Sequence, residues 1–141
     1  MYLLDTDTVI YILKGHPAVE QNLKRRSHDP IKLCVVTLME LYYGAYKSQK
    51  VTGNLAKIRT LENSLEILSV GPETVEIFGI EKAKLERRGT PLEDFDLVLG
   101  CCALAHNLTL VTNNVRHFRK IESLRVVDWA KESDSSLEGG R

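Results

Sequence analysis

The stretch Tyr2-Leu3-Leu4-Asp5-Thr6-Asp7-Thr8 decides the interpretation of the whole chain, because a short apolar run ends there in carboxylates. Such a run, followed by capping residues, predicts a buried parallel strand that turns into a helix over 9–14. Asp5 would then lie at the carboxyl end of a strand, the edge at which open α/β sheets bind ligands. The alternative is a purely local role in helix capping, for which Asp7 or Thr6 is the expected residue.

The composition indicates one globular domain. The chain has 141 residues, of which 43% are hydrophobic, and its 19 basic residues balance its 19 acidic ones. This length is enough to bury a core without disulfides or a structural metal. The neutral total argues against a protein that coats nucleic acid nonspecifically, although a basic rim around an acidic cleft would give the same sum. We expect a domain over 1–130 and a disordered tail over 131–141.

The cysteines and the hydropathy pattern predict a cytoplasmic location. Cys34, Cys101 and Cys102 are odd in number and lie in apolar runs, which is typical of buried free thiols in a reducing compartment, and their spacing does not suggest a zinc site. No window approaches 18 uncharged apolar residues, and the amino terminus lacks the signal-peptide pattern. We therefore expect neither a membrane span nor secretion.

The order of apolar runs and helical periodicities predicts an α/β fold. Further strands are expected over 31–36, 67–70, 109–112 and 124–127, and the main further helices over 17–28, 37–48, 55–65, 73–88 and 92–105. The 55–65 helix is expected to be the first arm of a helical hairpin, which gives the order β-α-α-β-α-α-α-β-α-α-β-α-β. This alternation predicts a three-layer α/β/α domain with a central, mostly parallel sheet of four to five strands. The 92–105 helix is apolar nearly all round and must be central and buried.

Three acids occupy equivalent places in this predicted fold. Asp5 follows the first strand, Glu40 lies in the first turn after the second, and Asp96 lies in the first turn of the buried helix. If the strands are parallel, the three side chains face one cleft. Each has a local alternative, because Thr37-x-x-Glu40 matches a capping box and Asp96, or Asp94 beside it, is favoured by the helix dipole.

The combination of these acids predicts a metal site. Two carboxylates about 4 Å apart repel by about 4 kcal/mol at an effective dielectric constant near 20. A divalent cation relieves that cost, and oxygen ligands select Mg²⁺ or Mn²⁺ over zinc. Such ions bind substrate phosphates, which points to phosphoryl chemistry. Thr112 and Asn114 fall at the same edge, where they either hold a ligand water or cap a turn.

At these residues the chain resembles the PIN-domain ribonucleases, specifically the VapC-like toxins of bacterial toxin-antitoxin pairs. The matching pieces are 3–6, 37–44, 95–99 and 110–118, in the family's order and at its spacing. The resemblance implies a PIN-like fold over 1–130 and a metal-dependent endoribonuclease with Mg²⁺ or Mn²⁺ at its site. It also implies a homodimer and a small antitoxin partner that blocks the cleft.

The resemblance assigns roles to individual residues. Asp5, Glu40 and Asp96 are the expected catalytic residues and metal ligands. Residues expected around them are Thr6, Asp7, Asp94, Thr112, Asn114 and His117, with Arg116 as a contact to RNA phosphate. Two departures stand out: Asp7 lies where the family often has Asn, and many members carry a fourth acid at the position of Asn114 or His117. Because fewer anionic ligands hold a second cation weakly, we expect one firmly bound metal.

Two other functions fit parts of the sequence. The segment 5–9 also matches the DxDx[TV] opening of haloacid-dehalogenase-type phosphatases, which would need Lys82 or Lys84 together with the acids Asp94 and Asp96, but no strand precedes those acids. Release of phosphate from a phosphomonoester, without RNA cutting, would favour this function. The second alternative is a PIN module that binds RNA or protein without turnover, which failure to bind Mg²⁺ or Mn²⁺ would support.

Overall fold

The computed structural model describes residues 1–131, so the tail predicted over 131–141 lies outside the described residues except for Lys131. The strands are Tyr2–Leu4 (β1), Ile31–Cys34 (β2), Glu66–Leu68 (β3), Thr109–Val111 (β4) and Val126–Val127 (β5). The helices are Thr6–Lys14 (α1), Pro17–Arg25 (α2), Val35–Tyr46 (α3), Val51–Ser64 (α4), Pro72–Arg88 (α5), Asp94–Ala105 (α6) and Val115–Phe118 (α7).

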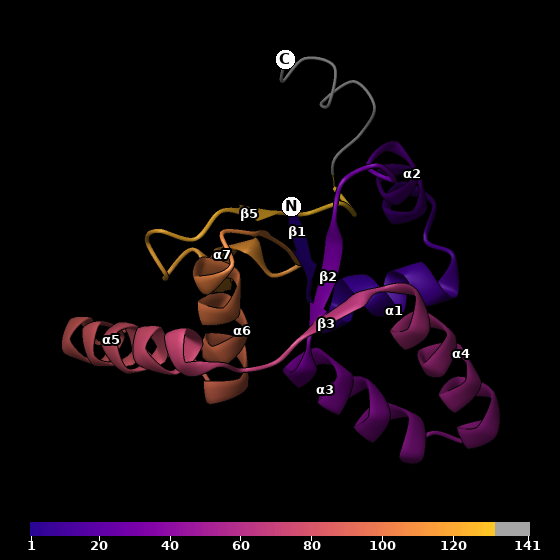
Figure 1. Ribbon diagram of the computed structural model, residues 1–141, viewed down its shortest axis with the longest axis horizontal. Helices are drawn as coiled ribbons and strands as arrows, with labels where there is room; N and C mark the ends of the chain where they lie inside the picture. Colours follow the sequence, from indigo (N-terminus) through magenta and orange to yellow (C-terminus); the bar gives the residue numbers. More distant parts are fainter. Residues whose placement is uncertain (132–141) are drawn as a thin grey trace.

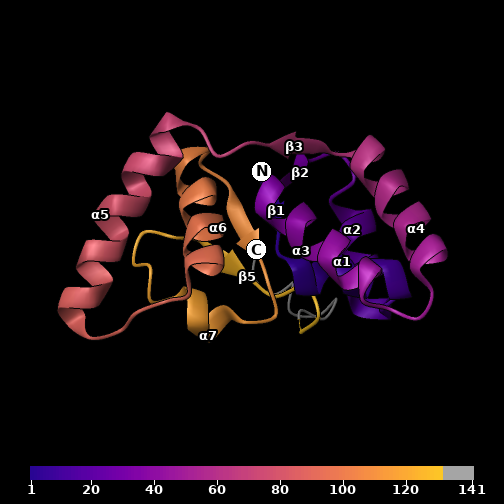
Figure 2. The same ribbon diagram turned by 90° about the horizontal axis from the view of Figure 1, so that it is seen from below.

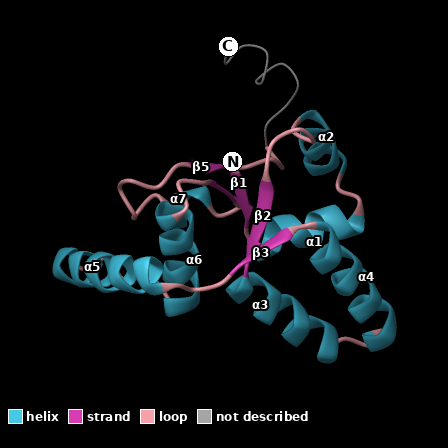
Figure 3. Ribbon diagram, viewed as in Figure 1, coloured by secondary structure: helices cyan, strands magenta, loops and turns pink. Residues whose placement is uncertain are grey.

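The strands form one sheet in the order β3-β2-β1-β4-β5, and every neighbouring pair is parallel. In its centre Leu3 pairs with Leu110 and Leu4 with Val111. This confirms the predicted parallel α/β architecture. The strands run through the middle of the molecule (Figures 1 and 3). Because they are parallel, their carboxyl ends lie at one edge of the sheet.

Helices cover both faces of the sheet. Helices α1 to α4 lie on one side, and α5, α6 and α7 lie on the other (Figure 2). Successive strand residues alternate between the two layers: Leu3 and Leu110 belong to the core with α6, whereas Leu4 and Val111 belong to the core with α1 and α3. Because both faces are buried, the strands read in sequence as continuous apolar runs.

Helix α6 is central, as its apolar composition predicts. Leu97, Leu99, Gly100 and the residues that follow as far as Ala103 are buried. Gly100 allows a close approach, since a Cβ atom there would lie 2.5 Å from Cδ1 of Ile121. The middle of this helix, one turn after Asp96, therefore packs against the segment that follows α7.

The main difference from the sequence prediction lies after β2. The strand ends at Cys34 and helix α3 begins at Val35, so Thr37 lies inside the helix rather than at its cap. The predicted capping box of Thr37 and Glu40 is therefore wrong. The helical hairpin consists of α3 and α4, with no further helix before β3, so the predicted order contained one helix too many among the described residues. The strand was predicted to extend through Val35 and Val36 because β-branched residues are typical of strands.

Two smaller expectations were tested. All three cysteines are free and buried, as predicted. Within residues 1–131, none of the helices combines the length and the apolar character needed to span a membrane. The remaining predicted elements are present, with bounds that differ by a few residues from those expected.

Candidate active site

Asp5 is placed by both the strand before it and the helix after it. Its backbone N–H donates to the carbonyl of Val111 on the neighbouring strand β4 (2.9 Å), which fixes it at the sheet edge. Its Oδ1 accepts from the Thr6 N–H (2.7 Å), so Asp5 itself is the N-cap of α1. The expectation that Asp7 or Thr6 caps this helix was wrong. The Oδ2 atom of Asp5 accepts a hydrogen bond from Thr112 Oγ1 (2.7 Å), a contact that helix capping does not need.

The environment of Asp5 disfavours its charged form. The residue is 8% exposed. Burial, followed by the nearby carboxylate of Asp7 and, more weakly, that of Asp96, raises the Asp5 pKa to about 7, against the opposing hydrogen bond from Thr112. A carboxylate with this pKa at a sheet edge is a candidate functional group, because burial and like charge are costly unless something compensates for them.

Glu40 reaches the same place from helix α3. Its Oε1 accepts a hydrogen bond from Thr6 Oγ1 (2.6 Å), the side chain next to Asp5. The contact joins residues 34 positions apart and ties the first turn of α1 to the first half of α3. Glu40 therefore faces the Asp5 region, which the capping alternative would not require.

Asp96 completes the set from helix α6, on the opposite face of the sheet. Its Oδ2 lies 3.0 Å from Nε2 of His117, which comes from α7. Asp94, two residues earlier, is exposed and forms an ion pair with Lys82 of α5 (2.9 Å). The structure thus separates the two aspartates: Asp96 is near enough for its charge to act on Asp5, whereas Asp94 pairs with Lys82 and does not join this group.

Asp7 lies two residues after Asp5 and joins α1 to the segment after β4. Its Oδ2 accepts from the backbone N–H of Asn113 (3.2 Å) and lies 3.4 Å from Thr112 Oγ1. Burial raises the Asp7 pKa, and the charge of Asp128 adds to the effect. Our sequence analysis missed Asp128, although it follows strand β5 as Asp5 follows β1, and that position was the available signal.

The remaining predicted site residues differ in their exposure. Thr112 is fully buried, and its Oγ1 accepts from the N–H of Asn114 (3.1 Å) while it donates to Asp5. Asn114 and Arg116 are exposed. We name the region that contains Asp5, Asp7, Glu40 and Asp96 the carboxylate cleft.

The chemistry of the carboxylate cleft fits a hard divalent cation. Across residues 1–131, no three acidic, histidine or cysteine side chains are gathered closely enough to form a ready-made metal cage. Asp5 is held by Thr112, Glu40 by Thr6, and Asp96 by His117. Magnesium commonly binds through one or two carboxylates, retains several waters and adds substrate phosphates, so such an open oxygen set suits it.

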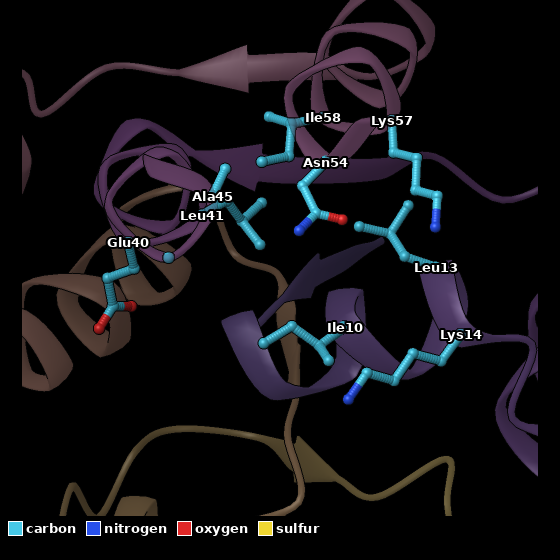
Figure 4. Close-up of a pocket in the computed structure, with 10 residues that line it drawn as sticks. Ile10, Leu13, Lys14, Glu40, Leu41, Ala45, Asn54, Lys57 and Ile58 are labelled. Carbon is cyan, nitrogen blue, oxygen red and sulfur yellow. The ribbon is translucent and has the colours of Figure 1, made fainter. Parts of the chain in front are cut away.

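An apolar cavity adjoins the cleft. It has a volume of about 320 Å³ and lies between α1, α3 and α4 (Figure 4). Ile10, Leu41 and Ile58 line it, Lys14 lies at its border, and Glu40 is at one end. An occupant of this cavity would therefore reach one of the cleft carboxylates.

The phosphatase alternative is not assembled in the structure. It would need Lys82 or Lys84 near Asp5, but Lys82 pairs with Asp94 and Lys84 with Glu81 of its own helix (3.3 Å). Both lysines belong to α5, which packs outside α6 (Figure 2). The carboxylate cleft therefore has no such lysine.

Comparisons with known proteins match most of the chain. The profile of the PIN domain matches residues 2–124. Ribonuclease VapC2 of Haemophilus influenzae is 37% identical over 130 residues, which cover 91% of this chain and 97% of that protein. The tRNA(fMet)-specific endonuclease VapC of Salmonella typhimurium is 35% identical over the same shares of both chains.

Solved structures give the same answer for the fold. A chain in the crystal structure of VapBC2 from Rickettsia felis, bound to a DNA fragment from their promoter, has a TM-score of 0.85 and 32% identity. A chain of DNA-bound VapBC from Salmonella typhimurium has a TM-score of 0.84 and 33% identity. The matches cover 91% of this chain and 98% and 97% of those chains.

Proposed function

This chain belongs to the PIN domain family and is similar to its VapC ribonucleases over most of its length; from that premise we propose that the carboxylate cleft is its endoribonuclease active site. Asp5, Glu40 and Asp96 are the proposed catalytic residues and metal ligands. The observation that carries the proposal is the buried Asp5 carboxyl, whose pKa is raised to about 7 by burial and by its neighbours Asp7 and Asp96. Acids gathered in this way lower the stability of the folded protein, and such groups are typical of catalytic and metal-binding sites.

Mg²⁺ is the proposed cofactor, with Mn²⁺ as a substitute of the same ligand preference. When bound, such an ion polarises a phosphate and lowers the pKa of a coordinated water. The protein's own part is orientation: Thr112 fixes the Asp5 carboxyl, Thr6 fixes that of Glu40, and His117 fixes that of Asp96. Attack by water leaves a 5′-phosphate and a 3′-hydroxyl on the RNA products, since the RNA 2′-hydroxyl takes no part.

The surrounding residues support the cleft in different ways. Asp7 holds the backbone of Asn113 and so positions the segment that carries Thr112. Asn114 is exposed at the rim, and the exposed Arg116 on the following helix turn is proposed to contact RNA phosphate. Asp94 takes no part, because Lys82 holds it away from the cleft.

We further propose that the protein is a toxin whose partner is a small antitoxin. Structural neighbours at 32% and 33% identity were solved as VapBC assemblies. The apolar cavity beside Glu40 suits an antitoxin segment with apolar anchors, since its lining is apolar and Lys14 and Lys57 offer charges to acidic residues (Figure 4). Such a segment would block the cleft. The exposed side chains of Tyr43 and Tyr46 on α3 support a homodimer.

The substrate to test first is tRNA, because one relative is named a tRNA(fMet)-specific endonuclease.

The direct test is cleavage of RNA with Mg²⁺, followed by analysis of the product ends. We expect 5′-phosphate ends, and a loss of rate of at least about 100-fold in Asp5→Asn, Glu40→Gln and Asp96→Asn. Asp94→Asn is the matched control, because it removes the same charge from the same helix turn outside the cleft. Undiminished cutting by Asp96→Asn, or equal loss in Asp94→Asn, would remove the proposed active site.

A further inference from the structure

Two cysteine side chains from distant parts of the chain meet in the core between the sheet and α6. Cys34 is the last residue of β2, and Cys102 lies near the end of α6. Both are fully buried in the same apolar cluster, and their free thiols are joined by a hydrogen bond. The carboxylate cleft uses neither of them. We name Cys34 and Cys102 the core thiol pair.

The two thiols of the pair differ in how readily they ionise. The hydrogen bond from Cys102, together with the backbone N–H groups of Val36 and Val35, lowers the Cys34 pKa to about 7, against the opposing effect of burial. Cys34 is the N-cap of α3, and the amino terminus of a helix favours a thiolate. The same hydrogen bond, with burial, raises the Cys102 pKa. Cys34 is therefore the nucleophile of the pair, and Cys102 supplies the second thiol.

The neighbouring Cys101 differs from the pair. It is also fully buried on α6, but burial, followed by the charge of Glu81, raises its pKa to about 12. A thiol of this kind is inert, because the thiolate is the reactive form. The chain therefore carries a reactive pair and an unreactive third cysteine one residue away.

A bond between the two sulfurs would join the helices that carry two of the cleft acids. Cys34 directly precedes α3, the helix of Glu40. Cys102 lies on α6, the helix of Asp96, on the other side of the sheet (Figure 2). A disulfide bond is about 2 Å long, shorter than a hydrogen bond between two sulfurs, so its formation draws α6 toward the end of β2. Because the core is closely packed, this shift reaches Asp96 and Glu40.

We propose that hydrogen peroxide converts the core thiol pair into a reversible disulfide, and that this disulfide lowers the activity of the carboxylate cleft. The Cys34 thiolate attacks one peroxide oxygen, the O–O bond breaks, and hydroxide departs, which leaves Cys34 as a sulfenic acid. The Cys102 sulfur then attacks the Cys34 sulfur, the S–O bond breaks, and the hydroxyl group departs as water with the proton of Cys102. In total the two thiols lose two electrons and two protons, and the peroxide is reduced to two waters. The effect on activity rests on the proposed ribonuclease function.

Burial of both sulfurs determines the rate of this reaction. An oxidant reaches them only when the packing of α6 on the sheet opens locally. Hydrogen peroxide is small, so it needs less opening than an alkylating reagent does. We therefore expect the folded protein to be oxidised over about minutes to hours, and a dithiol reductant to reverse the reaction by thiol–disulfide exchange.

The first test maps the bond. The full chain is reduced, treated with hydrogen peroxide, denatured and alkylated, and its peptides are identified by mass spectrometry. We expect the peptide of Cys34 to be joined to Cys102, with Cys101 alkylated. Cys34→Ala and Cys102→Ala should prevent the link, whereas Cys101→Ala, the matched control on the same helix, should retain it. Wild-type protein alone reports the link, so the test does not depend on the folding of a variant.

The second test compares RNA cleavage with Mg²⁺ before and after oxidation. Displacement of a catalytic group by about 1 Å costs a large factor in rate, so oxidised wild type and oxidised Cys101→Ala should cut at least about tenfold more slowly. Dithiothreitol should restore both rates. Cys34→Ala and Cys102→Ala each lack one thiol of the pair, so peroxide should leave their rates unchanged. Thermal unfolding of each variant shows that it is folded.

The outcomes separate this inference from the proposed function. It is overturned if peroxide leaves both sulfurs of the core thiol pair free, if it modifies Cys101 instead, or if the linked protein cuts RNA as fast as the reduced protein. If reduced wild type cuts RNA while these results appear, the ribonuclease function stands and only the redox control fails. If reduced wild type does not cut RNA, the proposed function fails, and a mapped link between Cys34 and Cys102 still establishes the disulfide.

Discussion

The carboxylate cleft and a hollow lined by Arg116, Arg119 and Lys131 meet at Asn113, and they place opposite charges in opposite environments. In the cleft, Asp5 is nearly buried and each carboxylate is held by a hydroxyl or imidazole. In the hollow, Arg116, Arg119 and Lys131 are exposed and unpaired among the described residues.

This difference determines what each site responds to. Buried like charges are weakly screened, so the cleft should respond to protons and to divalent cations. Exposed cations cost little in the free protein and are screened, so the hollow should respond to salt. The neutral net charge of the chain conceals this division.

The largest effect that we expect to distinguish the two sites is a change in the free energy of unfolding with pH. The Asp5 pKa is raised from its ordinary value of 3.8 to about 7, so the folded state binds this proton more tightly than the unfolded state. The resulting stabilisation is present below about pH 4 and is lost as the pH rises through about 7. Without divalent cations, the free energy of unfolding of wild type, relative to Asp5→Asn, should fall by a few kcal/mol over this interval.

Denaturant unfolding at several pH values in EDTA measures this difference. Asp5→Asn is a suitable reference because its side-chain oxygen still caps α1. Above pH 7, added Mg²⁺ should restore stability to wild type and much less to the variant. A difference between the two proteins that does not change with pH would show that the cleft does not hold Asp5 as described.

A smaller effect tests the packing of α6, the helix that carries Asp96, against the segment after α7. In Gly100→Ala the new Cβ would lie 2.5 Å from the buried Ile121, which should cost about 1–3 kcal/mol, offset by about 1 kcal/mol of helix propensity. We expect a net loss of about 1 kcal/mol. Gly79→Ala is the control, because nothing lies within 4 Å of its Cβ in the middle of α5, and it should stabilise by about 0.5–1 kcal/mol.

Thermal or denaturant unfolding measures both glycine variants. Gly100 is on the helix that carries Asp96, and Ile121 follows the helix that carries His117. A shift of one helix against the other would disturb the contact between Asp96 and His117, so the Gly100→Ala variant should also lose activity. Equal stabilisation by the two substitutions would mean that α6 is not packed as closely as the structure indicates.

The sequence predicted the architecture because its strands are buried on both faces. Apolar runs bounded by Pro30, Gly71 or Asn107 mark strands and helices clearly, and a helix without a polar face must be central. The start of α3 was missed, since Val35 and Val36 favour a strand locally and only the tertiary packing places them in a helix.

The cleft was predicted less completely than the fold. Equivalent positions after parallel strands indicated that Asp5, Glu40 and Asp96 share an edge, but the choice of hydrogen-bond partner depends on side-chain geometry. The sequence prediction made Asp96 catalytic and placed Asp94 around the site, whereas in the structure Asp96 contacts His117 and Asp94 pairs with Lys82. It also did not single out Asp128, because burial of one carboxylate oxygen is a property of the packed structure.

On this structure, the cleft carboxylates are expected to form a site for a hard divalent cation. Calorimetric titration of wild type with Mg²⁺ at pH 6.5 tests it most directly, with Asp5→Asn and Asp96→Asn as comparisons. We predict that wild type binds one ion with release of a proton, because Asp5 must ionise, and that both variants bind at least about tenfold more weakly. Absence of Mg²⁺ and Mn²⁺ binding to wild type, or binding by both variants as tight as that of wild type, would show that the cleft carboxylates do not form a site for such an ion.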